Sequence, residues 1–117
     1  MAQAITKTLL DGVVADGDSI IVDTIGHTRY TLQIDAVNSG SPAGVDAVVT
    51  WYGSVDGVTF ESIEANTLST AGATFNHNCS STGLIKVYKK LKVTVSSWVK
   101  GSLTAQLFMT GHGGPAY

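Results

Sequence analysis

The sequence predicts an all-β protein that folds as a two-layer antiparallel β-sandwich of about eight strands, with a jelly-roll-like topology. Apolar residues recur with a period of two in the strongest segments, turn residues separate short runs, and no sustained helical period occurs. The length of 117 residues is typical of one domain with one core. We therefore expect one sandwich domain over residues 1–110 and a flexible, glycine-rich C-terminal tail over residues 111–117.

The first strands are marked by alternation and by turns rich in Gly and Asp. Residues 3–10 alternate well enough for an edge strand, and residues 11–18 form a turn-rich connection. A short strand is expected over residues 19–24. Residues 28–37 form the clearest half-buried strand, because apolar and polar side chains alternate along it. Its expected core positions are Tyr30, Leu32, Ile34 and Ala36.

The stretch over residues 50–60, TWYGSVDGVTF, is predicted to form the central hairpin. Asp56 and Gly57 lie between two runs of β-branched and aromatic residues, which is a strong signal for a two-residue turn with positive φ angles. Such a turn pairs Val55 with Val58 and thereby fixes the register of both arms.

This register assigns one face of the hairpin to the core. It sets Gly53 opposite Phe60 and Trp51 opposite Ser62. We expect this face to be dry, with the ring of Phe60 lying over the bare backbone of Gly53 beside Trp51. The residues predicted to build the hairpin are Trp51, Gly53, Asp56, Gly57 and Phe60.

The pattern weakens after the hairpin and sharpens again near the C-terminus. A short strand is expected over residues 73–76, whereas residues 84–88 fit either a strand or a brief helical turn. A strand follows over residues 90–95, and the last strand begins after a turn around Lys100 and Gly101. The expected core face of the last strand carries Leu103, Ala105, Leu107 and Met109.

The charges exclude some classes of partner. A net charge of −2 gives no reason to expect nucleic acid or an anionic membrane as a target. All nine acidic residues lie at or before Glu64, whereas most of the lysines follow it. The acidic and basic halves can pair inside the sandwich or between subunits. The low charged fraction, 14%, fits either a surface covered by a partner or a compact sandwich.

The cysteine content and the N-terminus bear on the compartment. Cys79 is the single cysteine, so an internal disulfide is impossible and an oxidising compartment is not implied. The N-terminus has no hydrophobic run of signal-peptide length, and nowhere do about 18 apolar residues run together. We expect synthesis in the cytoplasm without secretion by a cleaved signal.

No residue pattern predicts a catalytic, cofactor or metal site. The nucleophile pattern GxSxG and a phosphate-binding glycine loop are both absent from the sequence. His77 and Cys79 are two possible metal ligands without a second pair, which is short of a zinc site. Asp16 and Asp18 could bind calcium in a loop, but solvated turn aspartates explain them as well, since further ligands at set spacing are missing.

Two aromatic residues fall off the expected core faces. Phe108 shares its side of the last strand with polar residues, and Trp98 has the wrong parity for the core of its strand. A β-bulge could return either to the interior; if exposed, they mark a contact surface. Tyr117, at the end of the tail, is a third candidate for contact with a neighbouring subunit.

The segments WYGSVDGVTFESI and YKKLKVTV resemble a pair of signatures found in galactose-binding-like and discoidin-like sandwiches. The same pair recurs in small β-sandwich proteins of tailed bacteriophage virions, and the match covers roughly residues 45–110. The resemblance implies structural roles for the matched positions and no catalytic residue. In the later strand these positions are Tyr88, Lys90, Leu91 and Val93.

The resemblance implies a non-enzymatic virion structural protein. We expect a capsid decoration or cement protein that forms a homo-oligomer, a trimer by preference, and binds the major capsid protein or other virion proteins on the capsid surface. The alternative is a tail or fibre module that binds a host-surface glycan. An enzyme is the least favoured class.

Overall fold

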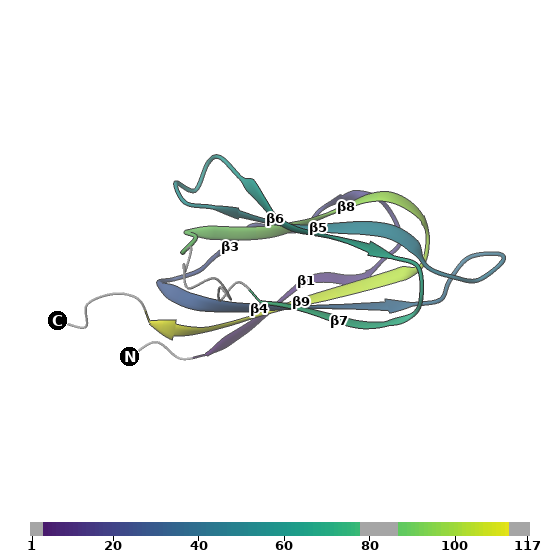
Figure 1. The fold of residues 1–117 in the computed structure, drawn as a ribbon, viewed down its shortest axis with the longest axis horizontal. Helices are drawn as coiled ribbons and strands as arrows, with labels where there is room; N and C mark the ends of the chain where they lie inside the picture. The colour runs from purple at the N-terminus through teal and green to yellow at the C-terminus, as the bar shows by residue number, and fades with distance from the viewer. Residues whose placement is uncertain (1–3, 78–86, 113–117) are drawn as a thin grey trace.

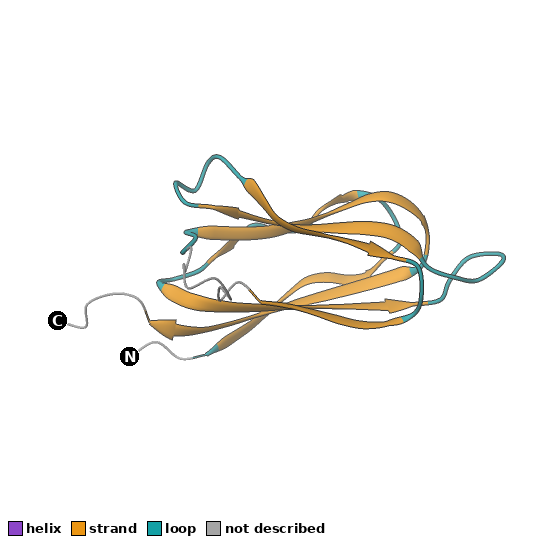
Figure 2. Ribbon diagram, in the orientation of Figure 1, coloured by secondary structure: helices purple, strands orange, loops and turns teal. Residues whose placement is uncertain are grey.

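The computed structural model describes residues 4–77 and 87–112, and these residues form strands and loops without a helix. It confirms the predicted all-β antiparallel sandwich, with nine strands in the described residues (Figures 1 and 2). Within these ranges no helix could span a membrane. The strands are β1 (Ile5–Val13), β2 (Gly17–Asp18), β3 (Val22–Asp23), β4 (His27–Val37), β5 (Asp46–Ser54), β6 (Glu61–Leu68), β7 (Gly72–His77), β8 (Lys90–Lys100) and β9 (Ser102–His112).

The strands divide into two layers that face each other in Figure 1. The four-stranded sheet has the order β1-β9-β4-β7. The five-stranded sheet has the order β2-β8-β5-β6, and β3 also pairs with β8. All strand pairs are antiparallel. Consecutive strands often lie in opposite sheets, so the core is closed by segments that are distant in sequence.

The core lies between the sheets, and β4 and β9 supply much of it. All four predicted core residues of each strand are buried, which confirms the alternation read from the sequence. Leu32 and Leu107 are cross-strand partners and are both fully buried. Because side chains alternate along a strand, the residues between these core positions lie on the outer face of the sheet.

The predicted central hairpin exists, but its two-residue turn and its register are wrong. β5 and β6 are antiparallel neighbours joined by a loop over residues 55–60. Gly53 pairs with Glu61, and the register shifts between Trp51 and Tyr52. Trp51 therefore pairs with Glu64 instead of Ser62: the register at Gly53 is already shifted by one residue, and a β-bulge on β6 adds one more.

Side-chain hydrogen bonds explain the longer loop. The Oδ1 atom of Asp56 accepts hydrogen bonds from the backbone N–H of Val58 at 2.7 Å and of Thr59 at 2.8 Å. The hydroxyl of Ser54 donates to the same oxygen at 2.9 Å and accepts from the N–H of Gly57 at 2.8 Å. These local bonds satisfy donors that a tight hairpin would have paired across the strands. Gly57 keeps the positive φ that was predicted, at 85°.

The loop also changes which residues of the hairpin are buried. Val55 and Val58, which were predicted to pair across the turn, lie in the loop and are 60% and 81% exposed. Phe60 does not cover Gly53 as predicted. The ring of Tyr88 lies there instead, since a Cβ atom added to Gly53 would come within 2.6 Å of the Cγ of Tyr88. Trp51 is fully buried.

Other boundaries differ by a few residues. The short strand β2 falls inside the predicted connection over residues 11–18, and the strand expected over residues 19–24 is reduced to β3. The turn at Gly101 is confirmed, with a φ of 109° between β8 and β9. β9 extends to His112, which pairs with His27, so it enters the stretch that was expected to be tail.

Candidate interaction surface

The outer face of the four-stranded sheet is formed by neutral polar residues and two phenylalanines. On β9 the outward positions include Gln106 and Phe108, because Leu107 and Met109 point into the core. Thr31 on β4 is the cross-strand partner of Phe108, and Gln33 is the partner of Gln106. We call this the outer neutral face; its central residues are Thr6, Thr31, Gln33, Phe75, Gln106 and Phe108.

The two phenylalanines flank a shallow groove on this face. Phe75 on β7 is 59% exposed and Phe108 on β9 is 41% exposed. The groove has a volume of about 320 Å³ and is lined by the six central residues of the outer neutral face. Two large exposed apolar side chains with amides and hydroxyls between them are typical of a contact surface, because charged residues are depleted at the centre of such surfaces.

The charges of β4 lie toward the two ends of the outer neutral face. Arg29 and Asp35 are exposed and share the parity of Thr31 and Gln33, which places all four on the outward side. Neither Arg29 nor Asp35 forms an ion pair within the described residues. The outward middle of β4 is therefore neutral. The positive charge of Arg29 lies before it and the negative charge of Asp35 lies after it.

The outer face of the five-stranded sheet is organised differently. Lys92 on β8 forms an ion pair with Asp18 on β2 at 3.3 Å. The Nζ atom of Lys92 also lies 5.5 Å from the ring centroid of Tyr52 and 4.8 Å from that of Phe60. The charge and the aromatic rings on this face therefore contact each other within the chain.

Hydrogen bonds on the five-stranded sheet lower the pKa values of two carboxyl groups. Asp18 accepts a hydrogen bond from the hydroxyl of Thr94 at 2.7 Å, and this bond, followed by that from Lys92, lowers its pKa. The backbone N–H groups of Thr59 and Val58 lower the pKa of Asp56 to about 2. Both carboxylates stay ionised at neutral pH and bind donors of their own chain.

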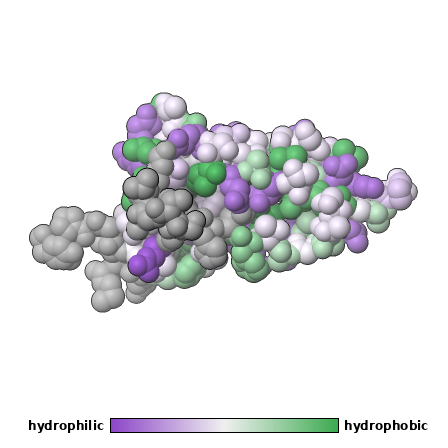
Figure 3. All heavy atoms as spheres, viewed as in Figure 1, coloured by the Kyte–Doolittle hydropathy of each residue, from purple (hydrophilic) through white to green (hydrophobic). Residues whose placement is uncertain are grey.

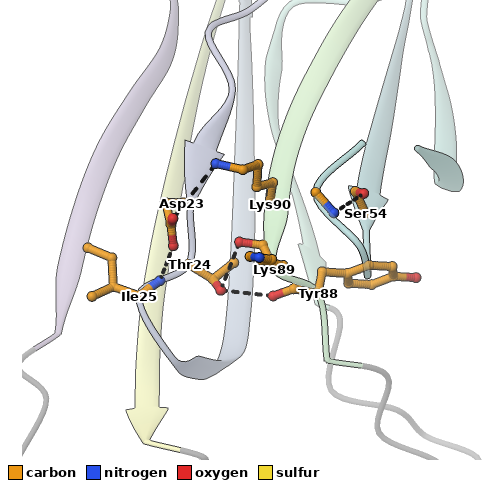
Figure 4. Close-up of polar contacts among 8 residues, drawn as sticks. Asp23, Thr24, Ile25, Ser54, Tyr88, Lys89 and Lys90 are labelled. Carbon is orange, nitrogen blue, oxygen red and sulfur yellow. Dashed lines mark hydrogen bonds and ion pairs between the residues drawn. The ribbon is translucent and has the colours of Figure 1, made fainter. Parts of the chain in front are cut away.

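A buried hydrogen-bond network joins the two sheets at one end of the sandwich, and Figure 4 shows its bonds from Thr24 to Tyr88 and Lys89. The hydroxyl of Thr24 donates to the backbone oxygen of Tyr88 at 2.8 Å, and the N–H of Thr24 donates to that of Lys89 at 3.1 Å. The hydroxyl of Tyr30, on the four-stranded sheet, donates to the backbone oxygen of Tyr88, beside the five-stranded sheet, at 3.1 Å. The N–H of Lys89 donates to the oxygen of Ser54 at 2.7 Å. These bonds hold both sheets in fixed positions.

Next to this network a strained turn exposes an isoleucine. Ile25 has a φ of 53°, which β-branched residues rarely adopt, and is 57% exposed. Its N–H donates to Oδ1 of Asp23 at 2.8 Å, as Figure 4 shows. With Ile20 and Ile21 it lines a second hollow of about 200 Å³. In the view of Figure 3 the hydrophobic residues are scattered among polar ones.

The structure separates the residues that were predicted to form an interface. Phe108 lies on the outer neutral face, whereas Trp98 is half-buried and packs against the core. Ser97 has a φ of 52° and the register of β8 shifts nearby, so a bulge returns Trp98 toward the interior. Its indole N–H donates to the oxygen of Gly101 at 2.8 Å. Tyr117 lies outside the described residues.

The candidate calcium ligands already have partners in the chain. Asp16 accepts a hydrogen bond from the N–H of Trp98 at 2.8 Å, and Asp18 binds Thr94 and Lys92. No group of three His, Cys, Asp or Glu side chains among the described residues could hold a metal ion. Cys79 lies outside these residues, so the pair that it forms with His77 in the sequence is not described.

Sequence reasoning missed most of the outer neutral face. Phe75 lies in the short strand predicted over residues 73–76, which is too short for its parity to show which side is buried. Gln33 and Gln106 are ordinary polar positions until β4 and β9 are known to be neighbours. The one available signal was the parity of Phe108, which pointed to this face.

The fold is similar to that of solved structures. No protein-family model matches the chain, and no curated protein matches it. The SPBc2 prophage-derived protein YomS has a similar structure, with a TM-score of 0.60 and 9% identity over 92% of this chain and 94% of that chain. A protein of the disulfide-linked pili that form Bacillus endospore appendages has a TM-score of 0.49 and 10% identity over 94% of this chain and 86% of its own. PirA has a TM-score of 0.49 and 7% identity over 93% and 94% of the two chains. At these identities the likeness establishes the sandwich fold alone.

Proposed function

We propose that this chain is a non-enzymatic structural protein of a bacteriophage virion, and specifically a capsid decoration or cement protein. In this function it associates with itself, as the trimer expected from the sequence, and docks on the capsid lattice. The contribution of each copy is contact area and rigidity, with no chemical step.

The observation that carries the proposal is the outer neutral face. It presents Phe75 and Phe108 on a flat sheet, which suits contact with another protein surface. The buried bond between the sheets, from Tyr30 to Tyr88, helps to keep this face preorganised, so little ordering is required on docking. The fold is also shared with a prophage-derived protein, which is compatible with a phage origin.

We also propose that the topology is a jelly roll. If β2 and β3 are counted as one strand position beside β8, the sandwich has eight positions divided equally between the sheets. Eight strands in two sheets is the arrangement of jelly-roll domains, which are common in viral capsid proteins.

The proposal is tested by locating the chain in particles. Virions are purified from cells that carry the gene, their proteins are identified by mass spectrometry, and the chain is labelled with an antibody for electron microscopy. We expect the chain in the purified particles and the label distributed over the shell. Absence from purified particles would overturn the proposal.

A glycan-binding tail or fibre module is the second candidate. The groove favours it, because aromatic side chains beside convergent amides, here Gln33 and Gln106, form a usual binding site for a small polar ligand. A glycan array would show specific binding by the native chain. This binding would be lost in the double variant Phe75→Ala/Phe108→Ala, and label on the tail instead of the shell would agree with it.

A further inference from the structure

We propose that two copies of this chain pack together through the outer neutral face, with their β4 strands antiparallel, so that Arg29 of each copy pairs with Asp35 of the other. This inference rests on the self-association in the proposed function and adds to it one two-fold contact between copies. The second copy is the occupant that the charges of this face favour.

The positions of the two charges on β4 are symmetric. Arg29 lies three residues before Leu32 and Asp35 lies three residues after it. Consider two copies whose outer neutral faces lie against each other. A two-fold axis in the plane between the two sheets, perpendicular to β4 and level with Leu32, exchanges these positions. It therefore brings Arg29 of one copy against Asp35 of the other, and forms two identical ion pairs.

Both charges are available for such pairing. Lys90 and Lys92 on β8 bind Asp23 and Asp18 within the same chain, at 3.7 Å and 3.3 Å. Arg29 and Asp35, by contrast, are exposed and have no ion pair within the described part of the chain. An exposed Arg can bind a carboxylate through two parallel hydrogen bonds, which sets orientation as well as attraction.

The same axis produces a neutral centre. Phe108 lies beside Thr31, and Gln106 lies beside Gln33, so the rotation places Phe108 of one copy over Gln106 of the other. No two like charges of β4 come together. An axis parallel to β4 would instead place Arg29 against Arg29 and Asp35 against Asp35, which is repulsive. The charge pattern therefore selects the antiparallel arrangement.

The available area is enough for a weak, specific dimer. Four strands about 4.8 Å apart and about 35 Å long offer roughly 600 Å² of flat surface per copy. A standard protein interface covers about 800 Å² per partner. We therefore expect association in the micromolar range in solution, with sheets crossing at about −30° as in aligned sheet packing. A pair with this symmetry is a dimer, so a trimer would require a second contact elsewhere.

A charge-swap experiment tests the pairing. Sedimentation equilibrium at low salt is used to measure dimerisation of the native chain, Arg29→Asp, Asp35→Arg and the double variant Arg29→Asp/Asp35→Arg. Each single variant places like charges together at both pairs and should weaken dimerisation by roughly tenfold or more. The double variant restores opposite charges and should recover most of the native affinity.

Two further variants keep the test independent of folding. Phe108→Ser should abolish the dimer while leaving the thermal midpoint nearly unchanged, because its ring is exposed. Val58→Ser, in the exposed loop between β5 and β6, is the matched control and should change neither. A native chain that stays monomeric at millimolar concentration would overturn the inference. So would single and double charge variants that are equally weak, or a dimer lost only on replacing Ile20 or Ile25.

The failure of this inference can be told apart from failure of the proposed function. If the chain is found on virion shells but the double charge variant does not recover, the inference is wrong and the proposed function stands. If the charge swap behaves as expected but the chain is absent from particles, the two-fold contact stands and the virion assignment fails.

Discussion

The two outer faces of this sandwich differ in how their polar groups are satisfied. On the five-stranded sheet, Lys92 contacts Asp18 and two aromatic rings, so its charge is bound within the chain. On the four-stranded sheet, Arg29 and Asp35 have no ion pair in the described structure, and Phe75 and Phe108 remain exposed. The charges of Lys92 and Asp18 on the first face are bound within the chain, whereas the second face leaves Arg29 and Asp35 available for another molecule.

Because of this difference, we expect substitutions on the two sheets to affect different properties of the protein. Substitutions in the five-stranded sheet and beneath it should change the free energy of unfolding. Substitutions on the outer neutral face should leave that free energy nearly unchanged and alter binding to a second molecule.

The largest loss of stability is expected for Trp51→Ala, because Trp51 is fully buried beneath the five-stranded sheet. Emptying such a site costs about 3–5 kcal/mol. Trp51→Phe is the matched control and should cost only about 1–2 kcal/mol, since the buried indole N–H has no hydrogen-bond partner to lose. Denaturant unfolding measures both; equal losses would contradict the structure.

Gly53→Ala should be the next most harmful change. The added Cβ would lie within 2.6 Å of the Cγ of Tyr88, so the ring or the strand must move. Overpacking of this kind costs about 1–3 kcal/mol. Adding Tyr88→Ala should make the double variant less unstable than the sum of the two single losses. Simple additivity in urea unfolding would show that Tyr88 does not cover Gly53.

Lys92→Met should have a smaller effect. The substitution keeps an apolar stem against Tyr52 and Phe60 but removes the charge that binds Asp18. A partly exposed ion pair with cation–π contacts contributes about 1 kcal/mol at most. The loss should shrink as salt is added, and a loss independent of salt would argue against an electrostatic origin.

Acid should loosen the loop between β5 and β6. The pKa of Asp56 is lowered from 3.8 to about 2 by hydrogen bonds, so ionised Asp56 stabilises the folded loop above pH 3.8. This contribution is lost as the pH falls from there through about 2, because the native state then binds the proton. The protection factors of the Val58 and Thr59 amides against hydrogen exchange, taken relative to the intrinsic rate at each pH, should fall over this range. Asp56→Asn should flatten the pH dependence.

The smallest change in stability is expected on the outer neutral face. Phe75→Ser and Phe108→Ser should each change the free energy of unfolding by less than about 0.5 kcal/mol, because both side chains lie on the surface. The same variants should lose association with a second copy or with the virion. A loss of stability as large as that of Trp51→Ala would show that these rings belong to the core.

The sequence predicted the architecture well because alternation survives in the long strands. β4 and β9 carry an apolar side chain at every second position, so their core faces could be assigned before any pairing was known. The two-residue turn at Asp56 failed because Ser54 and Asp56 bind the loop backbone, and this competition is invisible to a turn dipeptide.

The candidate surface was harder to predict because it is defined by strand order. Phe75, Gln33 and Phe108 lie on three different strands and meet only because β7, β4 and β9 are neighbours. The alternation of side chains along the strand identified Phe108 as outward-facing but could not assign Trp98. Ser97, just before Trp98, has a positive φ, and this changes the side of the sheet on which the next side chain lies. Such bulges depend on local backbone geometry that composition does not specify.

The most direct test of the difference between the two faces is a cryo-electron microscopy reconstruction of the particle that contains this chain. We expect the outer neutral face, with Phe75 and Phe108, to be covered by a second copy or by the capsid lattice. We also expect the face carrying Lys92 and Tyr52 to be open to solvent. A reconstruction in which the face of Lys92 makes the contacts and Phe108 remains exposed would contradict both expectations.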